Sequence, residues 1–205
     1  MPKKVLNLYA GIGGNRKLWK DVDVTAVEIE PTIAHIYSDY FPDDKVIVAD
    51  AHQYLLEHYD EGWDFIWSSP PCPSHSKIRK CGVHRGLNAP VYPDMKLYEE
   101  VIFLNNFVLC IWVVENVIAY YDPLIKPVEM NNHFIWSNIK ITEALFRGCN
   151  ENIRCNVGNL QKYYDFDLSK YKIKNKMKIL RNCIEPKLGL HIFNCAFKIK
   201  QEVLF

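Results

Sequence analysis

The sequence predicts an α/β fold built on a mostly parallel, doubly wound sheet, with a small irregular or β appendage. Short apolar runs alternate with segments of helical periodicity through residues 1–140, a pattern typical of successive strand and helix units. Several of these runs end in glycine or in an acidic residue, as strands do beside a ligand site. The length of 205 residues is sufficient for one domain with a sizeable core.

Composition and charge narrow the range of possible functions. Apolar residues make up 49% of the chain and the net charge is +1, so contact with nucleic acid requires a local basic cluster. The seven cysteines form no C-x-x-C pair and no zinc-type spacing with histidine; we therefore expect no metal and a reducing setting. No apolar stretch is long enough to span a bilayer and the start is unlike a signal peptide, which predicts a cytosolic protein without membrane contact.

The first strand–turn–helix unit indicates a ligand site. Residues 5–9 read as a buried strand, the glycine-rich residues 10–14 break it, and an amphipathic helix is expected from about Asn15. Glycine lets the backbone approach a ligand closely, and a helix N-terminus offers free amides to an anion. The G-x-G-G spacing differs from the dinucleotide fingerprint, so a plain tight turn is an equally good interpretation.

The second and third strands add acidic residues at their ends. A strand over 22–29 ends in Glu28 and Glu30 and precedes a helix over 31–40; a carboxylate at this position is the usual partner of ribose hydroxyls. A strand over 46–49 ends in Asp50, followed by a helical segment to residue 59. Asp50 either accepts a hydrogen bond from an adenine amino group or caps this helix. Together these units predict half of a nucleoside-cofactor site.

The fourth strand, residues 63–67, leads into the stretch Trp67-Ser68-Ser69-Pro70-Pro71-Cys72-Pro73-Ser74. Prolines on both sides of Cys72 remove backbone donors, so neither a helix nor a central strand can continue through it. A thiol held rigidly at a strand end is a candidate nucleophile. On position alone, a small buried apolar residue in a proline-rich turn is the better-supported alternative.

The next segment, residues 73–92, lacks sustained periodicity and carries basic and hydroxyl side chains. A loop of this length and composition predicts a mobile lid that closes on phosphate. Asp94 is expected to cap a helix through residue 104, and a fifth strand over 109–114 ends in Glu115-Asn116-Val117.

The C-terminal part is less regular. A further strand is predicted at 138–143, an irregular segment at 147–167, and a last helix or strand through residue 197. In residues 170–178 lysine alternates with apolar residues. Period two places the lysines on one face, which indicates equally a solvated edge strand or a stripe that follows a phosphate backbone.

Taken in order, these stretches resemble the DNA (cytosine-5) methyltransferases, and the resemblance covers most of the chain. The matching stretches are Asn7–Gly14, Glu28 with Ile29, Asp50, Pro71-Cys72, Glu115-Asn116-Val117, and Arg181-Asn182-Cys183-Ile184 with Pro186 and Gly189. The resemblance implies a Rossmann-like fold that binds S-adenosylmethionine and transfers its methyl group to C5 of cytosine in double-stranded DNA. It also implies that the target base is flipped out of the duplex.

The resemblance implies a role for each matching residue. In the family the glycines of the first motif hold the methionine end of the cofactor, which is matched by Gly11, Gly13 and Gly14. Glu28 corresponds to the ribose-binding acid, Ile29 to the residue packed on adenine, and Asp50 to the acceptor of the adenine amine. The full cofactor set is Tyr9, Gly11, Ile12, Gly13, Gly14, Glu28, Ile29, Asp50, Ala51, Pro71 and Asn182.

The implied chemistry begins with addition of the Cys72 thiolate to C6 of the base, because C5 alone is too weakly nucleophilic. Glu115 would bind the N3 and N4 edge of the base, and Asn116 would hold the loop geometry. The thiol is expected to be assisted by a positive site such as a helix N-terminus, the cationic sulfonium of the cofactor or the basic residues of the loop. The catalytic set is Cys72, Glu115, Asn116 and His133, and the nucleic-acid set is Lys77, Arg79, Lys80, Arg85, Lys172, Lys174 and Lys176.

The chain also departs from the family pattern. Asn131 and His133 occupy places that normally hold paired arginines, with His133 or Arg79 as the expected substitutes. We expect a catalytic and cofactor-binding core at 1–140, a reduced target-recognition region at 141–180, and a segment at 181–205 that returns to the core. A second subunit is one candidate source of the missing recognition surface, and a role in restriction and modification is one expectation. A tRNA-modifying enzyme and a non-catalytic DNA-binding subunit are the alternatives.

Overall fold

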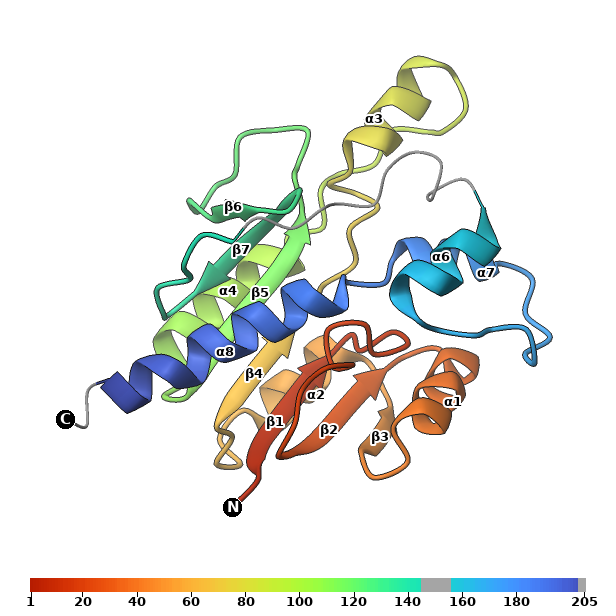
Figure 1. Ribbon diagram of the computed structural model, residues 1–205. Coiled ribbons are helices and arrows are strands. Elements are labelled where there is room, and N and C mark those ends of the chain that lie inside the picture. Colours follow the sequence, from red (N-terminus) through yellow and green to blue (C-terminus); the bar gives the residue numbers. More distant parts are fainter. Residues whose placement is uncertain (145–155, 203–205) are drawn as a thin grey trace.

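The computed structural model describes residues 1–144 and 156–202. A single seven-stranded sheet runs through its centre in the order β3-β2-β1-β4-β5-β7-β6 (Figure 1). The strands are β1 Lys3–Leu8, β2 Val22–Glu28, β3 Lys45–Val48, β4 Phe65–Ser68, β5 Ile111–Val117, β6 Val128–Met130 and β7 His133–Ser137. Strands β1 to β5 pair in parallel, and β7 is antiparallel to β5 and β6. The predicted mostly parallel, doubly wound sheet is confirmed.

Helices cover both faces of the sheet. They are α1 Pro31–Tyr40, α2 Ala51–His58, α3 Lys77–His84, α4 Lys96–Phe107, α6 Val157–Tyr164, α7 Lys176–Arg181 and α8 Pro186–Glu202. Helix α8 crosses the front face in Figure 1, α2 and α4 lie behind the sheet, α6 and α7 lie beside α1, and α3 projects beyond the strand ends. Because β1 has β2 on one side and β4 on the other, the carboxyl ends of these strands form a switch point, where α/β sheets bind ligands.

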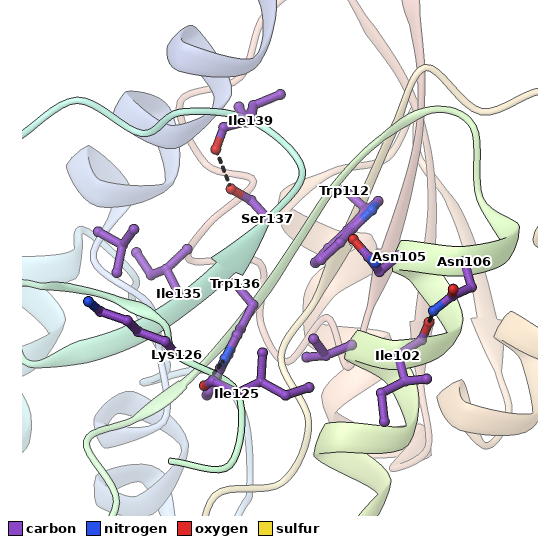
Figure 2. A pocket seen from close by; sticks show the side chains of 12 residues that line it. Ile102, Asn105, Asn106, Trp112, Ile125, Lys126, Ile135, Trp136, Ser137 and Ile139 are labelled. Atoms are coloured by element: carbon purple, nitrogen blue, oxygen red, sulfur yellow. Dashed lines mark hydrogen bonds between the residues drawn. The ribbon is translucent and has the colours of Figure 1, made fainter. Parts of the chain in front are cut away.

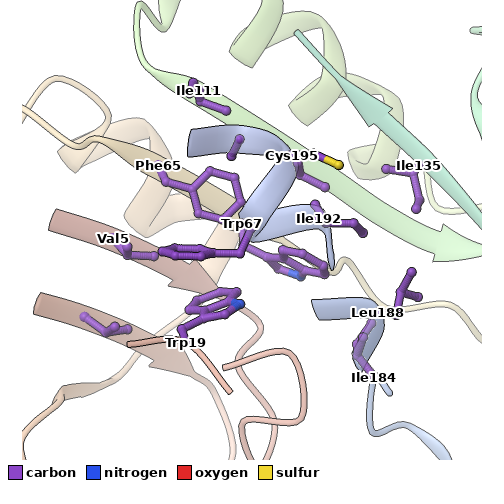
Figure 3. Packing of buried hydrophobic residues seen from close by; sticks show 14 of the residues in the cluster. Val5, Trp19, Phe65, Trp67, Ile111, Ile135, Ile184, Leu188, Ile192 and Cys195 are labelled. Atoms are coloured by element: carbon purple, nitrogen blue, oxygen red, sulfur yellow. The ribbon is translucent and has the colours of Figure 1, made fainter. Parts of the chain in front are cut away.

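Aromatic packing joins α8 to the sheet (Figure 3). Trp19 stacks on Phe193 with ring centroids 5.1 Å apart and contacts Trp67 of β4 at 5.9 Å. The indole Nε1 of Trp19 also donates to the carbonyl oxygen of Gly189 at 3.1 Å. Strands buried on both faces need apolar residues at successive positions, which accounts for the continuous apolar runs seen in the sequence.

The C-terminal segment contacts the glycine turn through two glycines. A Cβ on Gly189 would lie 2.4 Å from the backbone oxygen of Asn15, and one on Gly14 would lie 2.3 Å from that of Ile184. Side chains larger than hydrogen are therefore excluded at both positions. The segment that follows α7 is held directly against the turn after β1.

The helix expected from Asn15 is absent, and turns occupy residues 14–18. The amide of Trp19 donates to the oxygen of Arg16 at 3.0 Å, a spacing of three residues. Two side chains of this segment have separate tertiary partners. Trp19 is buried in the core, while Arg16 binds both carboxylate oxygens of Asp44 at 2.8 and 2.9 Å. Tertiary contacts override the helical pattern here.

Two further expectations are wrong. Residues 73–92 contain helix α3, whose first turn is capped by Ser76 Oγ, the acceptor for the amide of Ile78 at 3.2 Å. No strand forms at 138–143; a hairpin of β6 and β7 joins the main sheet instead. Asn131 and Asn132 form its turn with φ of +49° and +65°, values that asparagine tolerates better than most residues.

The lysine-rich segment 170–178 is likewise not an edge strand: it is irregular until α7 begins at Lys176. Its apolar residues Tyr171, Ile173 and Met177 pack with Ile12 and with residues of α1 and α6. Burial of the apolar positions between exposed lysines produced the period of two without any strand pairing. The irregular segment predicted at 147–167 lies partly outside the described residues.

None of the helices within 1–144 and 156–202 is both long and apolar enough to cross a membrane.

Gly189→Ala should destabilise the protein by about 2 kcal/mol, because the added methyl group meets backbone atoms of Asn15 that cannot rotate away. Urea unfolding would measure the loss as a lower midpoint at unchanged slope. Gly158→Ala is the control, since its Cβ would approach only the side chain of Asn156, at 3.2 Å. Equal midpoints for Gly189→Ala and the native protein would contradict this packing.

Candidate active site

The turn after β1 is closed onto the end of β2. The amide of Gly11 donates to Glu28 Oε2 at 2.9 Å, and the amide of Ala10 donates to the oxygen of Val27 at 3.0 Å. Tyr9 and Gly11 both have positive φ, +54° and +56°. The backbone thus turns sharply at the switch point, as the glycine-rich sequence predicted.

The end of β2 offers groups suited to a nucleoside. Glu28 is buried, and its other oxygen, Oε1, accepts from the amide of Glu30 at 2.9 Å. The next residue, Ile29, is 64% exposed, which is unusual for an isoleucine. A Cβ on Gly11 would meet nothing within 4 Å. An open backbone, an exposed apolar side chain and a carboxylate together fit a purine nucleoside, so these residues can hold S-adenosylmethionine.

Asp50 caps α2. Its Oδ1 accepts from the amides of His52 at 2.9 Å and Gln53 at 3.2 Å, so the capping interpretation is confirmed. The side chain is still 48% exposed, with Oδ2 4.0 Å from Lys96 Nζ. Its contact with adenine remains a prediction.

Other residues of the predicted cofactor set lie around this edge in different ways. The side chains of Ile12 and Ala51 are buried in the core, so any cofactor contact from them is through the backbone. Pro71 and Asn182 are exposed. Asn182 follows α7, next to Cys183, whose Sγ lies 2.4 Å from a Cβ built on Gly14.

Cys72 lies in a turn after β4. Its carbonyl oxygen accepts from the amides of His75 at 3.0 Å and Ser76 at 3.1 Å, and its side chain is half-buried. Asn116 Nδ2 donates to the oxygen of Pro70 at 2.9 Å, which ties this turn to β5. This hydrogen bond is consistent with the predicted role of Asn116 in holding the loop geometry.

The electrostatic surroundings of Cys72 disfavour its thiolate in the protein without ligands. Burial, and then the negative charge of Glu115, raise the pKa of the Cys72 thiol above its ordinary value, while Lys178 acts weakly in the opposite sense. Among the described residues, the effect of Lys178 does not offset burial and Glu115, and assistance from the bound sulfonium stays a prediction. A positive charge brought beside the thiol would lower its pKa and favour the thiolate.

Glu115 on β5 is buried and both of its carboxylate oxygens are occupied. Ser69 Oγ donates to Oε2 at 2.9 Å, and Oε1 contacts His133 Nδ1. Ser69 Oγ in turn accepts from Trp67 Nε1 at 2.8 Å. Glu115 thus joins the residues just before the cysteine turn to strand β7.

The two positions that depart from the family's arginine pair have separate partners. His133 contacts Glu115, and Asn131 Nδ2 donates to Glu185 Oε2 at 2.8 Å. Arg79 lies on α3, where its Nη2 donates to the oxygen of Ala89 at 3.2 Å. Of the two expected substitutes, His133 is the one that reaches the candidate catalytic acid.

The predicted nucleic-acid residues fall into two groups. Lys77, Lys80 and Arg85 are exposed on or beside the projecting helix α3. Lys172 and Lys174 are exposed in the segment before α7, and Lys176 Nζ donates to the oxygen of Ser169 at 3.3 Å. Their contact with DNA stays a prediction.

A cavity of about 290 Å³ lies away from this edge, between α4 and β7 (Figure 2). Trp112, at the start of β5, and Ile135, Trp136 and Ser137 of β7 line it together with Ile102 of α4. Its position at the amino end of β5 separates it from Cys72, so it is no part of the candidate active site.

Sequence reasoning missed Glu100, which is 1% exposed on α4. Its carboxylate accepts from Tyr9 Oη and Ser68 Oγ, both at 2.5 Å. A signal was present: Glu100 lies on the same helical face as the buried residues Leu97 and Leu104, where an acid must have partners.

The family comparison agrees with this geometry. The chain matches the family described as C-5 cytosine-specific DNA methylase over residues 3–103, which include the glycine turn, Glu28 and Cys72. Residues 3–103 belong to the C-5 cytosine-specific DNA methylase family. Membership implies S-adenosylmethionine as the cofactor. No curated protein matches the chain.

Several solved structures of methyltransferases are similar to this chain. The Entamoeba histolytica methyltransferase EhMeth is 10% identical and aligns over 97% of this chain and 98% of its own, with a TM-score of 0.52. A SAM-dependent methyltransferase from Agrobacterium tumefaciens is 15% identical over 59% of this chain, with a TM-score of 0.40. DNMT2 of Spodoptera frugiperda is 23% identical over 56%, with a TM-score of 0.38. The chain spans 40% and 35% of these last two proteins. The likeness to EhMeth shows a Rossmann-like fold.

Glu28→Gln should weaken binding of S-adenosylmethionine by about 1 to 3 kcal/mol, because the charged acceptor for ribose is lost and the contact with Gly11 is weakened. Calorimetric titration would measure it. Glu30→Gln is the matched control, since the exposed neighbour does not cap α1 with its side chain. Native affinity in Glu28→Gln would count against this cofactor site.

Glu115→Gln should lower the pKa of Cys72 in the protein without ligands, because the carboxylate is the second cause of its elevation. The rate of alkylation by iodoacetamide, followed by peptide mass spectrometry across pH, reports this pKa, with the exposed Cys81 as an internal reference. A native Cys72 that ionises below the ordinary value of about 8.5 would contradict the described surroundings.

Proposed function

We propose that the protein is a DNA (cytosine-5) methyltransferase that uses Cys72 as its nucleophile. The observation that carries this proposal is the pairing of Cys72 with Glu115 at neighbouring strand ends. Ser69, three residues before Cys72, donates to Glu115, and Asn116 donates to Pro70. The thiol and the carboxylate are therefore positioned by one hydrogen-bonded unit rather than by independent loops.

The residues divide the work as follows. When bound, S-adenosylmethionine supplies an electrophilic methyl group and a positive sulfonium. The Cys72 thiolate adds to C6 of the cytosine, forming a carbon–sulfur bond and making C5 nucleophilic. Glu115 holds the N3 edge and stabilises the charge that develops there. C5 then takes the methyl group, and the cofactor is left as S-adenosylhomocysteine. A base removes the C5 proton and the bond between C6 and sulfur breaks, which releases Cys72 as the thiolate and restores the aromatic ring.

His133 takes a supporting part in this scheme. Its Nδ1 contacts one oxygen of Glu115, and its side chain is 26% exposed. An arginine at this place would carry a permanent charge, whereas histidine titrates near neutral pH. His133 thus orients the carboxylate and can balance its charge in the protonated form.

The family described over residues 3–103 acts on DNA, and the described surface supports a nucleic-acid substrate. Lys77, Lys80 and Arg85 lie on or beside α3, which projects past the strand ends that hold Cys72. Such contacts with phosphate position a nucleic acid but do not read its sequence. The base must leave the stack for C6 to reach Cys72.

The reduced recognition region proposed at 141–180 has one described part that packs on the core. Leu160, Phe166 and Leu180 are buried with Ile12 and Ile36. Because the buried residues of 156–180 pack on α1 and the glycine turn, this side of the segment is not available for reading bases. This supports a short target, or recognition surface from a second subunit.

Incubation with DNA that contains 5-fluorocytosine should give a covalent complex that survives denaturing electrophoresis, because fluorine at C5 cannot leave as a proton does. Cys72→Ser should abolish the complex. Cys81→Ser, which removes an exposed cysteine of α3, should retain it.

Equal trapping by the native protein and Cys72→Ser would overturn the assignment of the nucleophile. Trapping with 5-fluorocytosine in tRNA and not in DNA would overturn the choice of substrate. A lack of trapping with either nucleic acid would favour the non-catalytic binding subunit.

A further inference from the structure

A second buried carboxylate lies at the same sheet edge and has no part in the chemistry proposed above. Glu100 of α4 is 1% exposed. Tyr9 Oη donates to its Oε1 and Ser68 Oγ to its Oε2, each at 2.5 Å, and His52 Nδ1 lies 2.9 Å from Oε1. One carboxylate therefore joins the end of β1, the end of β4 and the first turn of α2.

On the β1 side, Glu100 anchors a strained residue. Tyr9 has φ of +54°, a conformation that costs a non-glycine residue about 1 to 3 kcal/mol and persists only when surrounding contacts impose it. The hydroxyl contact with Glu100 is such a constraint. Since Gly11, two residues later, faces the cofactor site, Glu100 helps to shape the turn that receives the cofactor.

On the β4 side, Glu100 holds the start of the cysteine turn. Ser68 is the last residue of β4 and is fully buried. The next residue, Ser69, contacts Glu115, and Cys72 follows three residues later. The cofactor turn and the cysteine turn thus share one anchor.

His52 supplies the positive partner of Glu100. Its side chain is 17% exposed, and its Nε2 lies 3.5 Å from Glu99 Oε2. The hydrogen bond and the charge of Glu100, with a smaller contribution from Glu99, raise the pKa of His52, while burial and Lys96 oppose this. A cavity of about 180 Å³ between α2 and α4 is lined by His52, Glu99 and Glu100, so protons from solvent can reach the ring.

The remaining charged groups near His52 are on the same elements. Lys96, the first residue of α4, has its Nζ 4.0 Å from Oδ2 of Asp50, which caps α2. Burial and Glu100 raise the pKa of Tyr9 far above its usual range, so its hydroxyl stays a donor at every relevant pH. His52 is the member of this group whose side-chain type has an ordinary pKa near neutral pH, and Glu100 raises it.

We propose that Glu100 and His52 form a positioning pair that makes cofactor affinity depend on the protonation of His52. This inference rests on the proposed function for its ligand. With His52 protonated, the buried charge of Glu100 is balanced and the carboxylate holds Tyr9 and Ser68. Loss of that proton leaves a buried carboxylate without its counter-charge, and its hold on both turns weakens.

The sign of the pH dependence follows from the proposed coupling, in which protonated His52 and Glu100 hold both turns in the form that binds the cofactor. Because Glu100 raises the pKa of His52, the ring keeps its proton below about pH 6.5 and loses it as pH rises through the raised value. Cofactor affinity should therefore be highest at low pH and fall through neutral pH. By linkage, bound cofactor increases the proton affinity of His52 by the same factor by which protonation increases the cofactor affinity, and the pKa of His52 rises accordingly.

The test is calorimetric titration with S-adenosylhomocysteine from about pH 6 to about pH 9, a range that spans the titration of histidine. This ligand lacks the sulfonium charge, so the direct Coulomb interaction with His52 is small. The native protein should lose affinity by about fivefold or more over this range. NMR titration of the His52 ring, with and without ligand, should show the reciprocal rise in its pKa.

His52→Asn places an amide donor near the position of Nδ1 but does not titrate, so its affinity should change less with pH. The amino group of the ligand titrates equally in both proteins, and the difference between the two profiles reports His52. His58→Gln is the matched control: His58 lies on the same helix and pairs with Glu61 at 2.6 Å, outside this cluster. It should keep the native profile.

Identical profiles for the native protein and His52→Asn would overturn the positioning pair while leaving the proposed function intact. A lack of binding at every pH would overturn the cofactor site itself, and with it both proposals.

Discussion

The buried carboxylate of Glu115 is the group on which the candidate active site depends. An acid inside a protein must have donors at both oxygens, and here these come from Ser69 and His133. Ser69 precedes the cysteine turn, while His133 belongs to the antiparallel strand β7. Satisfying one buried charge therefore fixes the distance between the nucleophile's turn and the far side of the sheet.

The cofactor side of the site depends on close backbone packing. Gly14 and Gly189 allow the C-terminal segment to lie directly against the turn after β1, and Trp19 adds a hydrogen bond to the oxygen of Gly189. The last helix thus supports a turn that begins nine residues into the chain. Glu100 supports the same turn from the opposite face of the sheet, so its shape is imposed from both sides.

Most of the sheet could be predicted from the sequence because the apolar runs end abruptly at Glu28, at Asp50 and at Trp67, just before the cysteine turn, and strand ends of a parallel sheet meet at one edge. The fold class was confirmed in this way. The buried clusters were not predictable, because Glu100 meets Tyr9 across 91 residues of sequence. The predicted edge strand at 170–178 was wrong for a physical reason. Alternating burial does not require a strand when the apolar residues pack on neighbouring helices.

The most direct test of the central claim is the amount of 5-methyldeoxycytidine in DNA digested after incubation with the protein and S-adenosylmethionine. The account predicts that the native protein forms it and that Glu115→Gln forms at least about 100-fold less, the loss typical of removing a group that stabilises charge in the transition state. Native amounts of product from Glu115→Gln would contradict the role assigned to this carboxylate.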